Sequence, residues 1–372
     1  MTFFTALKII VLGTGTLILA HPAGGTIFYI LRIRYLYILL LSFCSTYFLT
    51  IFMINAGKKL DFNDYPSKRK VHQRPIPVTG GIAVFTGFFV AIARNMVFTD
   101  QVKGILIGST IIFFLGLLDD KYNLSSLVKL FVQMVGVGVL VYFGIRVRIV
   151  PHTVPLKNSW DILITYFGVI GITNAFNYLD GMNGEAPGLA VISSLTLFFI
   201  AHDGGIRTVS WLAIALSGSA LGFLPYNFPD AKIFLGDNGS TVIGFLLASI
   251  AIAGSWNAVN VPVAIVTPVL IFSIYIFDMT YTTVSRARNG LIKNFKDWVN
   301  YTGRDHIHHR LVQIGFTKTQ AVIIIWICAL IFGFSAFVIR RARLLNTVVI
   351  ITQSLLIYVL IMVLMYAGRN NT

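Results

Sequence analysis

The chain alternates long apolar runs with short polar stretches, and this alternation predicts its elements. Each run is about as long as the roughly 20 residues that a helix needs to cross a bilayer core of about 30 Å. Strands of a membrane barrel would instead alternate polar and apolar residues within each run. The pattern therefore predicts an all-α, polytopic integral membrane protein with about eleven transmembrane helices (ten to twelve). The predicted helices cover residues 35–54, 78–98, 103–118, 127–143, 160–178, 187–201, 207–224, 240–255, 259–278, 320–339 and 346–367.

The composition supports a membrane protein. Of the 372 residues, 56% are apolar and only 12% are charged, and the mean hydropathy is +0.80. A soluble domain carries about twice this share of charged residues. The two cysteines, Cys44 and Cys328, lie inside apolar runs, so a disulfide scaffold is excluded as well.

No linker or long repeat divides the chain. We expect a multi-span domain over residues 35–367 and a cytosolic tail at 368–372. The N-terminal segment, residues 1–34, is left open. Its apolar stretch 3–20 is interrupted by Lys8 and two glycines, and it fits an extra span, an interfacial helix or a signal-like leader about equally.

The basic residues predict the orientation in the membrane. With 29 Lys and Arg against 14 Asp and Glu, the net charge is +15. In a soluble domain this excess would suggest nucleic acid, but a membrane protein gathers Lys and Arg in its cytosolic loops, so we expect no nucleic-acid partner. If loop 55–77 is cytosolic, the segments on its side hold sixteen basic residues and the opposite loops hold eight. Arg340, Arg341 and Arg343 fall on the opposite side, which leaves the arrangement of the last two helices open.

The scarce acidic residues cluster at predicted cytosolic helix ends. Asp119 and Asp120 close the third predicted helix, Asp180 closes the fifth and Asp278 the ninth, while Asp237 precedes the eighth. An acid near the bilayer is costly unless it is paired, solvated or bound to a cation. Four helices thus bring carboxylates to one face of the membrane.

Amide side chains and glycines accompany these acids. Asn177, Asn183 and Asn238 stand beside them, and the neighbouring glycines allow tight turns at the helix ends. Mg²⁺ takes oxygen ligands and is commonly held by one or two carboxylates together with substrate phosphates. The cluster therefore predicts a Mg²⁺ site that handles phosphates. An ion-coupled transporter, the alternative from another functional class, would place its carboxylates near the bilayer midplane.

Two predicted cytosolic loops supply the basic half of the site. One contains RKVHQRP, and the longest contains GRDHIHHRL. Zinc is disfavoured because no cysteine accompanies the histidines and an arginine flanks them on each side. Donors to phosphate and sugar oxygens fit better, and a lysine at the start of the fourth helix can extend back to the same surface. The candidate donors are Lys70, His72, Lys129, Arg304, His306, His308 and His309.

Five ordered blocks resemble the polyprenyl-phosphate N-acetylhexosamine-1-phosphate transferase family (glycosyltransferase family 4). They are RKVHQRPIPVTGG, LGLLDDKYN, NAFNYLDGMNG, FLGDNGS and DHIHHRL, and they extend over about residues 35–320. Each block is weak alone, but the ordered set is specific. The resemblance implies Mg²⁺-dependent transfer of a sugar 1-phosphate from a UDP-N-acetylhexosamine to a polyprenyl phosphate, with release of UMP. It also implies an inner-membrane enzyme whose site faces the cytosol.

The resemblance assigns roles residue by residue. Asp119 and Asp120 match the pair of aspartates near the lipid phosphate. Asp180 matches a nucleotide-site aspartate, and Lys129 matches a diphosphate-binding lysine. The positions that match Mg²⁺ ligands, with Mn²⁺ as an alternative ion, are Asn177 and Asp237. The residues that match the sugar-recognition loop are His306, His308 and His309.

The chain departs from the family pattern in one turn. Asn183 stands where bacterial members commonly have Asp, and GEAPG (184–188) replaces the more usual GLAxG. An obligatory catalytic role at residue 183 is therefore doubtful, and we expect a substrate contact there instead.

The HIHH segment resembles enzymes that use UDP-GlcNAc, which makes this sugar the first choice. Related UDP-N-acetyl-deoxyhexosamines come second, and a phospho-MurNAc-pentapeptide transferase of peptidoglycan synthesis is the alternative within the family. The CDP-alcohol phosphotransferase signature is absent from the sequence. We expect direct in-line displacement, with a phosphorylated aspartate as the two-step alternative. The glycan pathway and the oligomeric state, including a homodimer, stay open.

Overall fold

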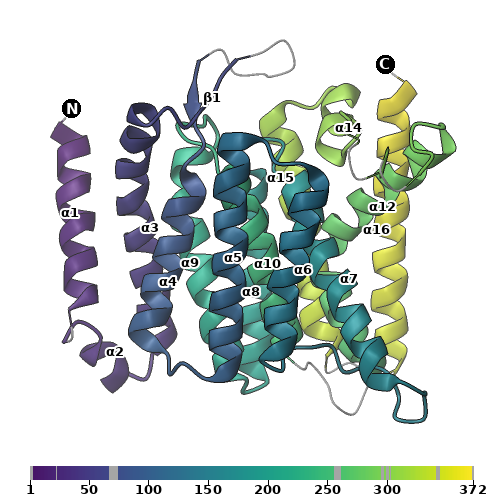
Figure 1. Ribbon diagram of the computed structural model, residues 1–372, viewed down its shortest axis with the longest axis horizontal. Coiled ribbons are helices and arrows are strands. Elements are labelled where there is room, and N and C mark those ends of the chain that lie inside the picture. Colours follow the sequence, from purple (N-terminus) through teal and green to yellow (C-terminus); the bar gives the residue numbers. More distant parts are fainter. Residues whose placement is uncertain are drawn as a thin grey trace.

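The computed structural model describes residues 3–21, 23–66, 74–254, 261–294, 297–298, 301, 303–340 and 344–370. They form a bundle of roughly parallel helices with one short pair of strands (Figure 1). The elements are α1 (Phe3–Ala20), α2 (Thr26–Ile30), α3 (Arg34–Lys59), β1 (Asn63–Asp64), β2 (Ile76–Pro77), α4 (Gly80–Asn95), α5 (Asp100–Tyr122), α6 (Ser126–Tyr142), α7 (Lys157–Tyr178), α8 (Glu185–Asp203), α9 (Arg207–Asn227), α10 (Asp237–Ala253), α11 (Val261–Ile271), α12 (Ser273–Arg288), α14 (Ile307–Ile314), α15 (Lys318–Ile339) and α16 (Leu344–Asn370).

Each of the eleven predicted segments contains a helix within its described residues, and the all-α, multi-pass prediction is confirmed. Among the described residues, six helices are long and apolar enough to cross a membrane, and α11 with α12 makes a seventh if the pair is one span. The helices α4, α6 and α10 are apolar but only 16, 17 and 17 residues long. The count of about eleven spans therefore stays a prediction.

The ninth predicted helix is broken. Residues 259–278 form one apolar run, but α11 and α12 meet at Phe272 and are bent by 79°. The helix α12 then continues past Asp278 to Arg288, so the expectation that Asp278 closes a helix is wrong. Two arginines, Arg286 and Arg288, lie in its last turn, where positive charge stabilises a helix C-terminus.

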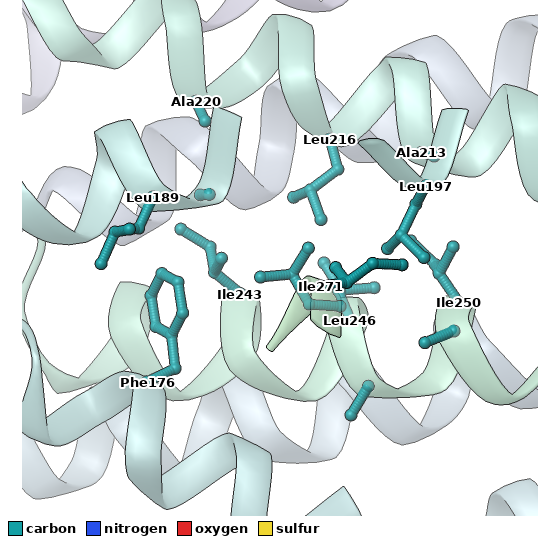
Figure 2. Packing of buried hydrophobic residues seen from close by; sticks show 14 of the residues in the cluster. Phe176, Leu189, Leu197, Ala213, Leu216, Ala220, Ile243, Leu246, Ile250 and Ile271 are labelled. Carbon is teal, nitrogen blue, oxygen red and sulfur yellow. The ribbon is translucent and has the colours of Figure 1, made fainter. Parts of the chain in front are cut away.

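The helix α10 lies in the middle of the bundle. It packs against α4, α5, α7, α8 and α9, and its residues from Asn238 to Ala251 are all buried. Figure 2 shows Ile243, Leu246 and Ile250 of this helix packed among side chains of the surrounding elements. A helix that is apolar on all sides is stable only when protein or lipid surrounds it. Burial of α10 therefore fixes Asp237, its first residue, at the centre of one end of the bundle.

That end, here called the site end, carries the strand pair and α14 (Figure 1). The strands are antiparallel, with Asn63 opposite Pro77 and Asp64 opposite Ile76. The C-terminal ends of α5 and α7 and the N-terminal ends of α8 and α10 point the same way. The sequence therefore brings its acidic helix ends together at one end of the bundle, as predicted.

The outside of the bundle is apolar. Phe131, Phe334 and Leu356 are 63%, 69% and 66% exposed, as expected for helices that face lipid rather than water. At the N-terminus, α1 lies beside α3. A side chain at Gly13 would meet the Phe48 ring of α3, so the two helices pack closely.

Candidate functional site

A cavity of about 790 Å³ opens at the site end. The ends of α5, α7, α10, α14 and α15 line it, together with the strand pair and the turn between α7 and α8. Eight of the residues predicted from the sequence line this cavity: Asp119, Asp120, Asn177, Asp180, Asn183, Asp237, Arg304 and His309. Chain segments almost 200 residues apart thus meet around one space.

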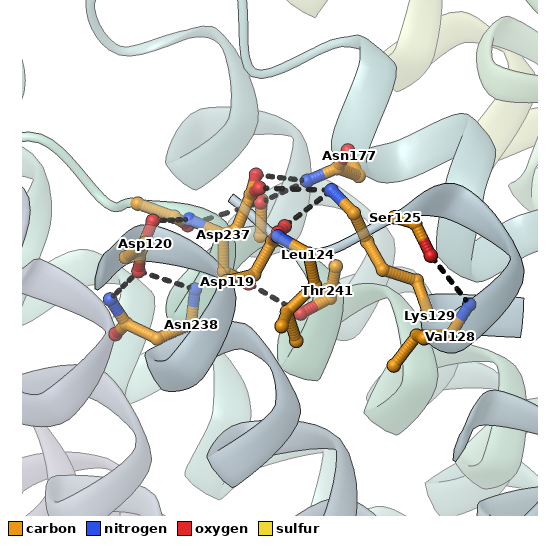
Figure 3. A network of polar contacts seen from close by, with 12 residues as sticks. Asp119, Asp120, Leu124, Ser125, Val128, Lys129, Asn177, Asp237, Asn238 and Thr241 are labelled. Atoms are coloured by element: carbon orange, nitrogen blue, oxygen red, sulfur yellow. Dashed lines mark hydrogen bonds and ion pairs between the residues drawn. The ribbon is translucent and has the colours of Figure 1, made fainter. Parts of the chain in front are cut away.

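Lys129 bridges two carboxylates at this cavity. Its Nζ pairs with Asp119 Oδ2 and lies 3.6 Å from Asp237 Oδ2 (Figure 3). Asp119 is only 3% exposed, and its Oδ1 accepts the backbone N–H of Leu124 over 2.8 Å. The helix α6 begins just after this turn, and Lys129 lies in its first turn. The lysine side chain therefore extends toward the carboxylate of Asp119 at the end of α5. The lysine charge offsets repulsion between the two acids.

The carboxylate of Asp120 accepts hydrogen bonds from the backbone at the start of α10. Its Oδ1 accepts the N–H of Asp237 over 2.8 Å, and its Oδ2 accepts the N–H of Asn238 over 3.0 Å. The side-chain amide of Asn238 donates to the same Oδ2 at 2.5 Å. The residue before the helix, Gly236, has φ +73°, a conformation that favours glycine. Asp120 therefore caps α10 and holds Asp237 in place (Figure 3).

Asn177 orients the Asp237 carboxylate from α7. Its Nδ2 donates to Asp237 Oδ1 over 2.9 Å and to Ser240 Oγ over 2.7 Å. Asp237 is thus held from three helices, yet its side chain remains 37% exposed. An oriented carboxylate that faces open space can take a cation or a substrate group.

The turn between α7 and α8 supplies Asp180 and Asn183. Burial raises the pKa of the Asp180 carboxyl to about 8, and the negative charges of Asp237, Glu185 and Asp120 add to the shift. Near neutral pH this group therefore holds a proton for most of the time. Asn183 donates from Nδ2 to the carbonyl oxygen of Pro229 over 3.0 Å, which ties the turn to the loop before α10.

The histidine segment divides between the cavity and the protein interior. Arg304 and His309 line the cavity, whereas His306 and His308 lie behind it and are 7% and 1% exposed. Burial lowers the pKa of His309 to about 3, and the neighbouring His308 and His306 act in the same direction. His309 is therefore neutral at pH 7 and is able both to donate and to accept hydrogen bonds.

Asp278 holds His306 rather than lining the cavity. Its Oδ2 lies 2.6 Å from His306 Nδ1, and its Oδ1 accepts the backbone N–H of Ile307 over 2.7 Å. On the other side of the ring, Arg286 Nη2 lies 3.2 Å from His306 Nε2, and Arg286 also forms a two-point ion pair with Asp305 at 2.6 and 2.8 Å. Burial opposes the charged imidazole, but the bond with Asp278 outweighs it and raises the pKa of His306. These bonds anchor the start of α14 to α12.

Two predicted residues, Lys70 and His72, lie outside the described residues. Other residues at the site were missed. Asn227 bridges two loops, accepting from Gly184 N over 2.7 Å and donating to Ile233 O over 2.9 Å. Asp230 and Lys318 line the cavity. None of these three residues lies in one of the five sequence blocks that resemble the family. The only feature of the sequence that could have pointed to them is that each is a polar residue close to a helix end.

Within the part of the chain that the structure describes, no group of three or more His, Cys, Asp or Glu side chains is arranged to hold a metal ion. A zinc-type cage is therefore not present among these residues. Aspartates outnumber the basic side chains at the site, and Asp237 is open to the cavity. That donor set fits a Mg²⁺ ion that relies on substrate oxygens and water for its remaining ligands.

Comparison with known proteins gives consistent relatives. A family model described as glycosyl transferase family 4 matches residues 102–255. A Bacillus subtilis (strain 168) protein named probable undecaprenyl-phosphate N-acetylglucosaminyl 1-phosphate transferase is 33% identical over 84% of this chain and 87% of its own length. The decaprenyl-phosphate N-acetylglucosaminephosphotransferase of Mycobacterium leprae (strain TN) is 32% identical over 80% and 82%. The undecaprenyl-phosphate alpha-N-acetylglucosaminyl 1-phosphate transferase of Escherichia coli (strain K12) is 28% identical over 76% and 78%.

Proposed function

The chain belongs to glycosyl transferase family 4, and from this premise we propose that it transfers N-acetylglucosamine 1-phosphate from UDP-N-acetylglucosamine to a polyprenyl phosphate and releases UMP. One observation carries the proposal. Asp119, Lys129 and Asp237, from three helices, meet beside a cavity at one end of a membrane-spanning bundle. A water-soluble nucleotide sugar and the phosphate head of a membrane lipid can both reach that place.

The proposed step is an in-line displacement. An oxygen of the polyprenyl phosphate attacks the phosphorus that carries the sugar, the bond from this phosphorus to the bridging oxygen breaks, and UMP leaves with the electron pair. A phosphate monoester has a second pKa of about 6, so the attacking oxygen needs no strong base at pH 7. The protein's contribution is then positioning and charge.

Lys129 supplies the positive charge in this scheme, and Asp119 keeps its ammonium group in position. A two-step route through a phosphorylated aspartate is the competing scheme. Rapid-quench trapping without lipid acceptor separates the two, because only the two-step route accumulates a sugar-phosphorylated enzyme.

We propose Mg²⁺ as the cofactor, with Mn²⁺ as a substitute. Asp237 and Asn177 are the residues that would hold the ion, together with phosphate oxygens of the donor. Such an ion supplies neutralisation of the charge that develops on the departing UMP. The excess of aspartates over basic side chains at the cavity supports this assignment.

The names of the relatives favour N-acetylglucosamine over MurNAc-pentapeptide as the transferred group. We place the enzyme in the cytoplasmic membrane with the site end facing the cytosol, where UDP-sugars are made. The charge bias of the loops supports this orientation.

The test is UMP release by purified protein with Mg²⁺, undecaprenyl phosphate and a panel of UDP-sugars. We expect release with UDP-GlcNAc only when the lipid phosphate is present. Release with UDP-MurNAc-pentapeptide alone would move the chain to the other branch of the family. Ion flux in liposomes without any UMP release would favour the transporter class.

A further inference from the structure

A buried acid–imidazole pair lies directly behind the cavity. Glu185, the first residue of α8, is fully buried, and His308 of α14 is 1% exposed. The ring Nδ1 lies 3.1 Å from Glu185 Oε1 and 3.0 Å from Oε2. Burying an acidic side chain is costly because a polar group leaves water, and a leucine would fill such a position without that cost. The pair therefore calls for an explanation other than packing.

Glu185 is held firmly from the backbone side. The preceding residue, Gly184, donates its N–H to Asn227 Oδ1 over 2.7 Å. The carbonyl oxygen of Glu185 accepts from Trp326 Nε1 of α15 over 3.4 Å. The backbone that carries Glu185 is thus held in place, and the side chain extends from it to the ring of His308.

The opposite edge of the His308 ring lies against the turn that carries Asp180. A Cβ atom at Gly181 would come within 2.4 Å of His308 Nε2, so the ring packs directly on the backbone of this turn. The same ring touches His309, with centroids 4.3 Å apart. His309 and Asp180 both line the cavity. His308 therefore connects Glu185 to two parts of the cavity wall, His309 and the turn of Asp180.

We propose that Glu185 is a positioning residue that sets the binding of the UDP-sugar. Through His308 it fixes His309 and the turn of Asp180 relative to each other. It does not touch Lys129 or Asp119, so the lipid-phosphate half of the site is independent of it. The inference rests on the proposed function, since it concerns the donor of that reaction.

The experiment compares Glu185→Leu with Glu185→Gln, using steady-state UMP release with each substrate varied in turn. Glu185→Leu should raise the KM for UDP-GlcNAc by about tenfold, the scale of one lost buried hydrogen bond. The KM for undecaprenyl phosphate should stay within about twofold. Glu185→Gln keeps a side-chain group that bonds the ring, and it should restore the KM for UDP-GlcNAc to within about threefold of wild type.

Ser193→Ala is the matched control. Ser193 is a buried residue of the same helix, and its Oγ lies 2.8 Å from the hydroxyl of Tyr275, away from the cavity. This variant also loses a buried hydrogen bond, but both KM values should remain at the wild-type level. If Glu185→Leu does not fold, Glu185→Asp carries the test, because its shorter side chain breaks the contact with His308 and should raise the same KM.

Three results would overturn the inference: an unchanged KM for UDP-GlcNAc, an equal rise for both substrates, or a Gln variant as impaired as the Leu variant. Failure of the proposed function is seen separately, in wild-type protein that releases no UMP. In that event, stabilisation of the folded protein by UDP, measured as a shift in Tm, still tests the pair. Loss of the shift in Glu185→Leu but not in Ser193→Ala supports it, and an equal shift in both overturns it.

Discussion

The carboxylate of Asp120 caps the helix that begins at Asp237. Its Oδ1 accepts the N–H of Asp237 over 2.8 Å, and its Oδ2 accepts the next N–H along the chain over 3.0 Å. An N-cap residue normally precedes its own helix. Here the acceptor comes from α5, so it satisfies free N–H groups of α10 and also fixes the two helices relative to each other. The neighbouring Asp119 has a different role, because it pairs with Lys129.

Asp120→Ala should lower both stability and activity. Loss of the cap is expected to cost about 1–2 kcal/mol of stability, and UMP release should fall because Asp237 is no longer held. Asp120→Asn should be milder, since its amide oxygen still accepts one N–H. Thr99→Ala is the control: Thr99 caps α5 at the other end of the bundle, so it should lower Tm without lowering kcat. Full activity in folded Asp120→Ala would contradict the proposed role.

Lys129→Met should abolish most of the activity while leaving the fold intact. The variant leaves Asp119 and Asp237 without their shared cation, and the positive charge beside these two carboxylates is lost, although Arg304 and Lys318 still line the cavity. Loss of one such group typically lowers kcat by about 10²–10³-fold. Lys121→Met is the comparison, because Lys121 lies over the rings of Phe62 and Tyr122 and should change kcat by less than about twofold. Equal rates for the two variants would remove Lys129 from the mechanism.

The sequence predicted the helices well because a membrane helix is set mainly by length and hydropathy. Each apolar run became helix, including α10, whose short apolar stretch is buried by protein on all sides. The break at Phe272 was missed, since hydropathy is uniform across it and carries no information on backbone direction. The extension of α12 beyond Asp278 was missed for the opposite reason, because the residues there are polar and yet helical; in its last turn Arg286 pairs with Asp305.

The site was predicted as a set of residues but not as a set of pairs. Acids at helix ends could be identified because an acid near the bilayer is costly unless it is paired, solvated or bound to a cation. Which partner each acid has depends on tertiary packing: Asp278 binds His306, and Asp120 binds the backbone of α10. Asn227 was missed altogether, since a buried amide that joins two loops has no spacing or motif of its own.

Asp237→Ala should abolish UMP release without unfolding the protein. Asp237 is a partly exposed carboxylate that lines the cavity and is the proposed Mg²⁺ ligand, so its removal should eliminate the response of the rate to added Mg²⁺. Chelation of divalent ions from the wild type should have the same effect and should be reversed by Mg²⁺. Asp100→Ala serves as the control, because Asp100 is exposed at the far end of the bundle and pairs only with Lys103 among its described contacts. Activity of Asp237→Ala that still rises with Mg²⁺ would refute the assignment.

Asp180 should make the stability of the protein depend on pH. Its pKa is raised to about 8 in the folded protein, against about 3.9 for an unfolded aspartate. Between these values the folded state binds a proton that the unfolded state releases, so stability should fall as pH rises from about 4 to 8. Asp180→Asn has no such group, and its Tm should fall less over this range, by a few degrees in comparison with wild type. Both proteins share every other titrating group, including His309, so the difference between their Tm curves isolates residue 180. Parallel curves would show that Asp180 is already ionised at neutral pH.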